Sequence, residues 1–284
     1  MNPLSRLRLR LSYKVLPHLH SINKLVYDSF SNAPFTRSPL ASPAKYYSLA
    51  NIASLNISTD VTDLETSLGY TIDREWLDQL ALFTQIVIKP SNLCYSHGRV
   101  LYSLLCDYLS RHDLFLKPIT IFETGTARGF SSLCMAKALS DLSVKGLIHT
   151  CDILPHSKPM YWNTISDHLS GPISRRHLLQ PWDEYLKYIF FVQSSSLSFL
   201  YLNQPYRVNF AFLDGSHTFS SVLKEFLLVS EHQLPGDIIV FDDYDSTLFP
   251  GVVQALKHIS DNYNYDLNFI HCSDTRYLAI ATKF

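Results

Sequence analysis

Three acidic residues in the second half of the chain follow apolar runs and could act together. Asp214 follows residues 208–213, and Asp242 and Asp243 follow residues 238–241. If both runs are parallel strands of one sheet, ligands bind beyond their carboxyl ends. The three carboxylates then converge with no Lys or Arg nearby in sequence, and they repel one another unless a cation lies between them. Oxygen ligands suit Mg²⁺, Mn²⁺ or Ca²⁺ rather than zinc, so we expect a divalent-metal site, with helix capping as the alternative role for one or two of the acids.

His217 lies three residues after Asp214 and adds a titratable group to this site. Imidazole titrates near neutral pH, so His217 could act as a general base. A single histidine more often supports its neighbours as a polar group, and this alternative stays open. The expected catalytic residues are His217 and Asp214.

A turn with two glycines lies earlier in the chain. Residues 119–122 form an apolar run that ends in Glu123, and Gly125 and Gly129 precede an apolar segment with helical spacing. Glycine lets the backbone turn sharply and approach a ligand, and the start of a helix attracts an anionic or carboxylate group. The dinucleotide fingerprint G-x-G-x-x-G would need a glycine where Ala127 stands. We expect a ligand-binding turn, with a ligand-free βα turn as the alternative.

A fourth acid, Asp152, ends the apolar run 146–151. An acid at the tip of the second strand is where a βαβ nucleotide site holds the two hydroxyls of a ribose. The alternative is a solvated acid at a strand end. The long segment 155–188 that follows contains Trp162, Arg175 and Trp182, and we expect a helix and a substrate-facing loop in it.

The alternation of strand-like and helical runs after residue 119 predicts a mostly parallel sheet with helices on both faces. The last two runs, about 267–271 and 277–282, are close enough to pair as antiparallel strands. We therefore predict an α/β fold, a Rossmann-like doubly wound sheet of seven strands with a C-terminal antiparallel pair. The other expected strands are 119–124, 146–152, 189–193, 208–213 and 238–241.

The region before residue 93 is expected to be an N-terminal extension with helices that contacts substrate or a second subunit. One helix should start near Asp73, and a further helix should cover 98–109. Residues 1 to about 60 contain Asn-Ala-Pro and two Ser-Pro pairs and are expected to be loops. Residues 93–284 would form the ligand-binding domain.

Composition limits the class of protein. Of the 284 residues 46% are hydrophobic and 17% are charged, and the net charge is −1, so no global field favours nucleic acid. The five cysteines are scattered and never spaced as C-x-x-C, which predicts reduced thiols and a cytoplasmic protein. No apolar run reaches the roughly 18 residues of a membrane span. The many aromatic residues before residue 120 make a homodimer our expectation.

The motifs resemble a known family. Residues 123–132, Glu-Thr-Gly-Thr-Ala-Arg-Gly-Phe-Ser-Ser, resemble motif I of class I S-adenosylmethionine-dependent methyltransferases, in the variant of small-molecule O-methyltransferases. Residues 212–217 and 240–244, with Pro250-Gly251, are similar to later motifs of a bacterial branch related to catechol and macrocin O-methyltransferases. The resemblance covers about residue 93 to the C-terminus.

The resemblance implies roles for residues at both ends of the cofactor and for a metal. It places one group at the methionine end, Asp152 at the ribose, and Ser195 and Ser196 near the adenine. It also implies that Asp214, Asp242 and Asp243 hold a divalent ion, for which we expect Mg²⁺, that polarises an acceptor hydroxyl. The residues implied at the methionine end are Glu123, Gly125, Thr126, Ala127 and Gly129.

The expected activity is transfer of a methyl group from S-adenosylmethionine to a hydroxyl of a small molecule, with a sugar or glycosylated metabolite as the candidate acceptor. One alternative is a nicotinamide-dependent oxidoreductase, which Ala127 disfavours. The other is a non-catalytic module of the same fold that binds a partner through its aromatic-rich N-terminal region.

Overall fold

The structure is a computed structural model, and it describes residues 35–111, 118–203, 207–273 and 276–284. Seven strands form one sheet in the order β3-β2-β1-β4-β5-β7-β6. The first five strands are parallel, and β7 is antiparallel to β5 and β6. The predicted fold class is confirmed. The strands are β1 (Ile119–Thr124), β2 (Gly146–Asp152), β3 (Ile189–Gln193), β4 (Phe210–Leu213), β5 (Ile238–Phe241), β6 (Tyr265–Ser273) and β7 (Arg276–Lys283).

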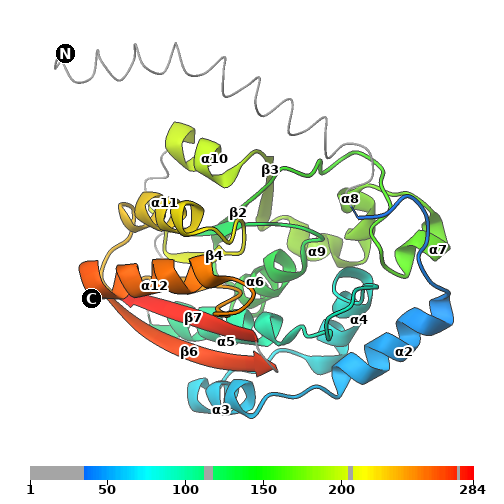
Figure 1. The fold of residues 1–284 in the computed structure, drawn as a ribbon, viewed down its shortest axis with the longest axis horizontal. Helices are drawn as coiled ribbons and strands as arrows, with labels where there is room; N and C mark the ends of the chain where they lie inside the picture. The colour runs from blue at the N-terminus through cyan, green and yellow to red at the C-terminus, as the bar shows by residue number, and fades with distance from the viewer. Residues whose placement is uncertain (1–34, 112–117, 204–206, 274–275) are drawn as a thin grey trace.

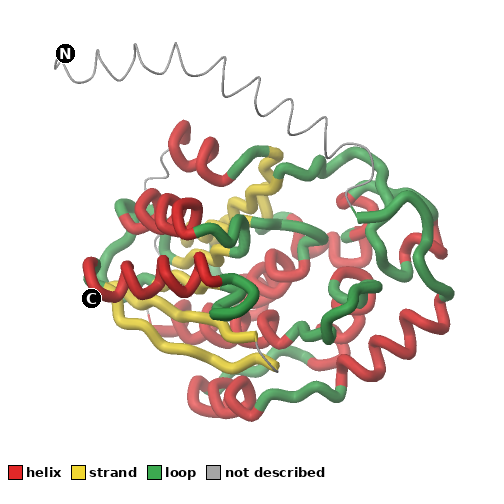
Figure 2. The backbone as a smooth tube through the Cα atoms, in the orientation of Figure 1, coloured by secondary structure: helices red, strands yellow, loops and turns green. Residues whose placement is uncertain are grey.

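Helices cover both faces of the sheet (Figures 1 and 2). Successive strand residues point to opposite faces, so Ile121 packs with α5 and α6, whereas Phe122 packs on the other side with α10 and α11. Helices α10, α11 and α12 lie side by side on this second face (Figure 1). These helices are α5 (Ser96–Arg111), α6 (Phe130–Asp141), α10 (Ser196–Asn203), α11 (Phe219–Ser230) and α12 (Pro250–Asn262).

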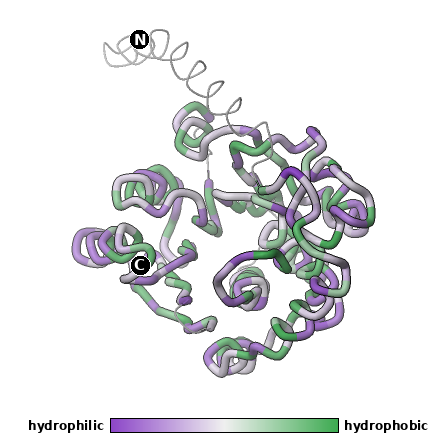
Figure 3. The backbone as a smooth tube through the Cα atoms, turned by 45° about the vertical axis from the view of Figure 1, so that its right-hand side comes forward, coloured by the Kyte–Doolittle hydropathy of each residue, from purple (hydrophilic) through white to green (hydrophobic). Residues whose placement is uncertain are grey.

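Helices α11 and α12 are amphipathic, and their apolar faces complete the core on this side of the sheet. Hydrophilic and hydrophobic residues alternate along the outer helices in Figure 3. The clearest case is α12, which buries Val252, Ala255, Leu256 and Ile259 against the sheet. The core therefore fixes the carboxyl ends of the central strands, where the predicted site residues lie.

The N-terminal region corrects one expectation. The predicted loops up to about residue 60 include helix α2 (Pro43–Ser54), because Pro43 occupies the first helical turn, where a proline is tolerated. Helices α3 (Thr59–Leu68) and α4 (Arg74–Thr84) follow, and the Asp73 carboxylate accepts a hydrogen bond from the Trp76 N–H at the start of α4, as predicted.

The N-terminal helices share a core with the sheet. Tyr46, Val61 and Leu80 from the three helices belong to the same buried cluster as Ile121 of β1. Exposed Tyr47, Ile52 and Leu55 lie along and just after α2. A domain boundary near residue 92 and a homodimer contact both stay predictions.

The segment between β2 and β3 contains four short helices, whereas one helix and a loop were expected there. These are α7 (Ser166–Ser170), α8 (Arg175–Leu178), the 3₁₀ helix η1 (Gln180–Trp182) and α9 (Asp183–Leu186). Trp162 at the start of the segment is fully buried against Met160 and Leu178.

All five cysteines are buried and unpaired, as the scattered spacing predicts. Within the described ranges no helix is long and apolar enough to cross a bilayer.

Candidate active site

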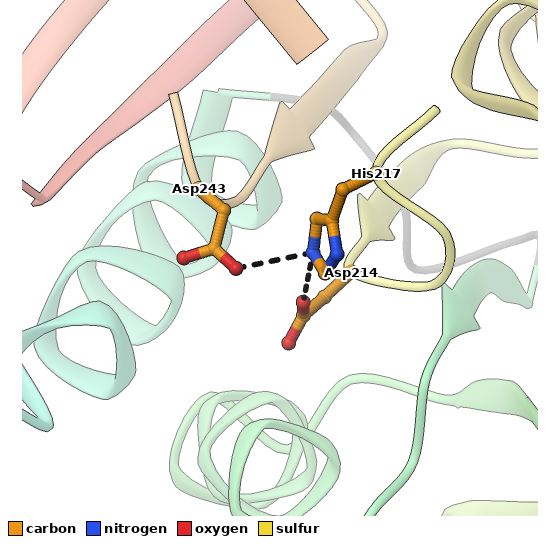
Figure 4. A group of neighbouring side chains, drawn as sticks. All are labelled: Asp214, His217 and Asp243. Atoms are coloured by element: carbon orange, nitrogen blue, oxygen red, sulfur yellow. Dashed lines mark ion pairs between the residues drawn. The ribbon is translucent and has the colours of Figure 1, made fainter. Parts of the chain in front are cut away.

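Two strand-end acids and one histidine come together at the carboxyl ends of β4 and β5 (Figure 4). The His217 Nε2 atom lies 3.0 Å from Oδ2 of Asp243 and 3.6 Å from Oδ1 of Asp214. Phe249 packs on the imidazole, with the ring centroids 4.5 Å apart. The loop after β4 and the loop after β5 thus bring predicted residues from separate motifs into one group.

In the absence of a metal ion, the two neighbouring carboxylates favour the protonated form of His217. The neighbouring carboxylates of Asp214 and Asp243 raise the pKa of its imidazole to about 10. A protonated imidazole has no lone pair with which to accept a proton, which favours the supporting role of His217 over the role of general base.

The structure does not bring Asp242 into this group. Burial tends to raise the pKa of Asp242, but the guanidinium of Arg276, together with His97 and the backbone N–H of Asp243, holds that pKa below its usual value. Arg276 donates from Nε to Asp242 Oδ1 at 3.0 Å and from Nη2 to Oδ2. Arg276 is the first residue of β7, which pairs with β5. Because Arg276 is far from Asp242 in the sequence, the motifs around Asp242 did not predict this contact. The prediction of three carboxylates without a basic neighbour therefore needs this correction.

The glycine-containing turn has the conformation that its sequence requires. Gly125 and Gly129 have φ values of 82° and 86°, in the left-handed region. A Cβ atom on Gly125 would overlap with the carbonyl oxygen of Asp214, and one on Gly129 would lie 2.7 Å from Leu179 Cδ1. Glycine at these positions therefore permits two close approaches, and the first joins the turn to the acid site.

Glu123, which precedes the turn, links β1 to the start of α6. Its carboxylate is fully buried and accepts hydrogen bonds from the hydroxyls of Ser131 and Ser132 in the first turn of α6. Burial raises the pKa of Glu123, and the two serines and Thr150 oppose the rise. The hydroxyl of Thr126 lies 2.5 Å from that of Thr150. Both predicted residues thus anchor the turn to β2 and α6.

Asp152 lies beside the same turn at the end of β2. Its Oδ2 accepts a hydrogen bond from the Ala127 N–H at 2.7 Å and another from Arg175 Nη2 at 3.0 Å. Its Oδ1 accepts from the Leu154 N–H at 2.8 Å. The sequence placed Arg175 only within a long segment, and no local signal linked it to this acid.

The serines after β3 have different roles. The Ser195 hydroxyl accepts from the Ser198 N–H at 3.2 Å and so caps α10. The Ser196 hydroxyl instead donates to the buried carboxyl of Glu225 on α11. Sequence reasoning missed Glu225, because it lies in the middle of an ordinary amphipathic helix.

Comparisons with known proteins support the resemblance. Residues 122–244 match the family model described as a methyltransferase domain. The chain carries a methyltransferase domain. This confirms the resemblance to class I methyltransferases and the prediction of an enzyme. No curated protein matches the chain.

One solved structure shares the fold of this chain, and a second is a weaker match. The O-methyltransferase TomG from Streptomyces achromogenes is 16% identical with a TM-score of 0.50, over 78% of this chain and 96% of TomG. An O-methyltransferase from Bacillus cereus is 12% identical with a TM-score of 0.49, over 85% of this chain and all (100%) of that one.

The methyltransferase has a cavity of about 520 Å³ next to the acid group. Asp214, Asp243 and Arg276 line one part of it, and Lys89 and Cys94 from the segment before α5 line another. Asp152 is not among the lining residues. The cavity is therefore on the side of the acids and is separate from the contacts of Asp152.

Glu225 gives this methyltransferase a pH-dependent stability. Burial raises the pKa of Glu225 to about 7. Its folded pKa exceeds the unfolded value, so stability is lost as pH rises from about 4.5 through about 7. The free energy of unfolding of Glu225→Gln minus that of the wild type is expected to be about 2 kcal/mol larger at pH 8 than at pH 5. Urea unfolding at both pH values measures the difference, and an equal difference at the two would contradict the assignment.

Proposed function

We propose that this protein transfers a methyl group from S-adenosylmethionine to a hydroxyl group of a small molecule. The observation that carries the proposal is the direct backbone contact between the glycine turn and the acid site. The Asp214 N–H donates to the Thr124 carbonyl at 3.2 Å and lies 3.0 Å from the Thr124 hydroxyl, while Gly125 abuts the Asp214 carbonyl. A donor held by the turn and an acceptor held by the acids would be neighbours, which is what group transfer needs.

When bound, S-adenosylmethionine supplies an electrophilic methyl group on its sulfonium. Gly125, Ala127 and Gly129 have left-handed backbone conformations, and the two glycines let a ligand approach closely. Asp152 would accept hydrogen bonds from the ribose, and Ser196 would lie on the adenine side. The likeness to TomG, which was solved in complex with SAM, supports this cofactor.

Calorimetry with S-adenosylmethionine tests the cofactor assignment. We expect binding by the wild type and at least about tenfold weaker binding by Asp152→Asn, because a hydrogen bond to a charged acceptor contributes about 1.5–3 kcal/mol. Lys45→Gln is a matched surface control that should bind like the wild type. No binding by the wild type at millimolar cofactor would refute the function.

The residues present fit a divalent cation in part. The buried Nε2 of His217 has no hydrogen-bond partner of good geometry among the described residues, and it lies between two carboxylates. Two carboxylates and an imidazole form a mixed donor set, which suits Mn²⁺ better than Mg²⁺. We therefore place the metal on Asp214, His217 and Asp243, where it would displace the proton from the His217 imidazole and lower the pKa of an acceptor hydroxyl. Asp242 is not included among the metal ligands, because its carboxylate pairs with Arg276.

Titration with Mn²⁺ in a calorimeter distinguishes the two ligand sets. Asp243→Asn is expected to weaken Mn²⁺ binding at least about tenfold, a loss of about 1.4 kcal/mol. Asp242→Asn is expected to change it less, because that carboxylate serves Arg276. A larger loss in Asp242→Asn would restore the ligand set predicted from the sequence, and no Mn²⁺ binding at millimolar concentration would remove the metal.

The acceptor is a small hydroxyl compound, with a sugar or glycosylated metabolite as our candidate. The cavity beside the acids is lined by side chains of both charges, including Lys89 and Asp243. This lining favours a polar acceptor over an apolar one. A cytoplasmic location and a homodimer remain parts of the proposal.

A further inference from the structure

Ala127 has an uncommon backbone conformation for its residue type. Its φ of 44° lies in the left-handed region, where a Cβ atom is close to its own backbone. Such a conformation costs a non-glycine residue about 1 kcal/mol and persists only where surrounding contacts hold it. The contacts that hold Ala127 should therefore matter for the shape of the whole turn.

A closed ring of three hydrogen bonds holds the peptide groups of Ala127. The Ala127 N–H donates to Asp152 Oδ2 at 2.7 Å, and Arg175 Nη2 donates to the same oxygen at 3.0 Å. Arg175 Nε completes the ring by donating to the Ala127 carbonyl at 2.8 Å. One guanidinium thus fixes the strained residue of the turn and the acid beside it at the same time.

Arg175 is built into the protein as a permanent part of this ring. Its side chain is 2% exposed, and the Asp152 side chain is 9% exposed. The Ser174 hydroxyl caps α8 and so fixes the backbone that carries Arg175. The guanidinium also lies 5.8 Å from the ring of the buried Trp162. A long, rotamer-rich side chain held at two polar contacts and one aromatic ring has one orientation.

The ring leaves part of Asp152 available. A carboxylate can accept about four hydrogen bonds, and the backbone N–H groups of Ala127 and Leu154 together with Arg175 take three of them, while the backbone N–H of Ile153 also favours the charged form. The remaining capacity has a fixed direction, because the other bonds prevent the carboxylate from rotating.

We propose that Arg175 is a positioning residue of the cofactor site, which acts through Ala127 and Asp152 to orient the Asp152 carboxylate toward a ribose hydroxyl. The proposal rests on the proposed function, because the ribose belongs to S-adenosylmethionine. It assigns to the segment between β2 and β3 a role in cofactor recognition.

The test compares two ligands in two matched variants. S-adenosylhomocysteine and its 2′-deoxyribose analogue differ in one hydroxyl, so the ratio of their dissociation constants reports on ribose recognition alone. We expect the full-length wild type to prefer the ribose compound roughly tenfold or more. In Arg175→Met this preference should fall below about twofold. Arg176→Met, at the exposed neighbour on the same helix, should keep the wild-type ratio.

Arg175→Lys provides a second test in case Arg175→Met does not fold. Lysine keeps the positive charge but cannot donate to Ala127 and Asp152 with the fixed fork of a guanidinium, so its preference should lie between those of the wild type and Arg175→Met. Circular dichroism melting checks that each variant is folded.

Three outcomes would overturn the proposal. If Arg175→Met, or Arg175→Lys where methionine does not fold, weakened both ligands by the same factor, Arg175 would be purely structural. If the variant bound the ribose compound more tightly, Arg175 would compete with the ribose for Asp152. If the wild type bound S-adenosylhomocysteine with no preference over its deoxy analogue, ribose recognition would fail while the proposed function stood, whereas binding of neither ligand would remove both.

Discussion

Gly125→Ala is expected to lower the free energy of unfolding by about 3 kcal/mol or more and to abolish cofactor binding. Two effects add at this position. Gly125 has a φ of 82°, which costs alanine about 1 kcal/mol. The added Cβ would also overlap with the backbone carbonyl of Asp214, and a backbone atom cannot move aside like the end of a flexible side chain. Relief of the overlap must separate β1 from β4 at the point where the donor and acceptor sites meet.

Gly69→Ala is the matched control for the backbone conformation. Gly69 ends α3 with a φ of 77°, and no atom lies within 4 Å of an added Cβ. We therefore expect a loss of about 1 kcal/mol and unchanged cofactor affinity. Urea unfolding and calorimetry with S-adenosylhomocysteine measure both variants. Equal losses for Gly69→Ala and Gly125→Ala would show that the contact with Asp214 is not tight.

The sheet and the location of the site were predictable because both depend on local signals. Apolar runs of strand length that end in Glu123, Asp152, Asp214 and Asp242 place the acids at one edge of the sheet, since parallel strands present their carboxyl ends together. The Asp73 cap of α4 is likewise encoded within a few residues. Helix α2 was missed because Ser-Pro is frequent both in loops and at helix starts, and the tertiary contacts of Tyr46 decide between them.

The charge partners were not predictable, because they come from distant parts of the chain. Arg276 reaches Asp242 only through the antiparallel pairing of β7 with β5, and Arg175 reaches Asp152 only through the path of a segment with no regular pattern. Three strand-end acids without a base nearby in sequence predicted a divalent cation between them, and that cation stays a prediction. What the structure adds is a positive charge from a distant part of the chain, because the Arg276 guanidinium pairs with Asp242.

Arg276→Met is expected to lower the free energy of unfolding by about 3–5 kcal/mol, because removal of one partner leaves a buried charge unpaired. The Asp242 side chain is 1% exposed, whereas the Arg276 side chain is 23% exposed. Asp242 also lies beside Asp243 and Asp214, so the loss of Arg276 leaves three neighbouring acids with less positive charge. Urea unfolding at neutral pH measures the loss.

Arg111→Met is the control for removal of an arginine from an exposed pair. Arg111 pairs with Asp107 on α5 with 61% of its side chain exposed, and such pairs contribute about 1 kcal/mol or less. The double variant Asp242→Asn/Arg276→Met should recover much of the stability lost in Arg276→Met, because no unpaired charge remains. If the double variant were as unstable as the single one, Arg276 would act through packing. Recovery would instead establish that Arg276 is present because Asp242 must be buried as an anion at the edge of the acceptor cavity.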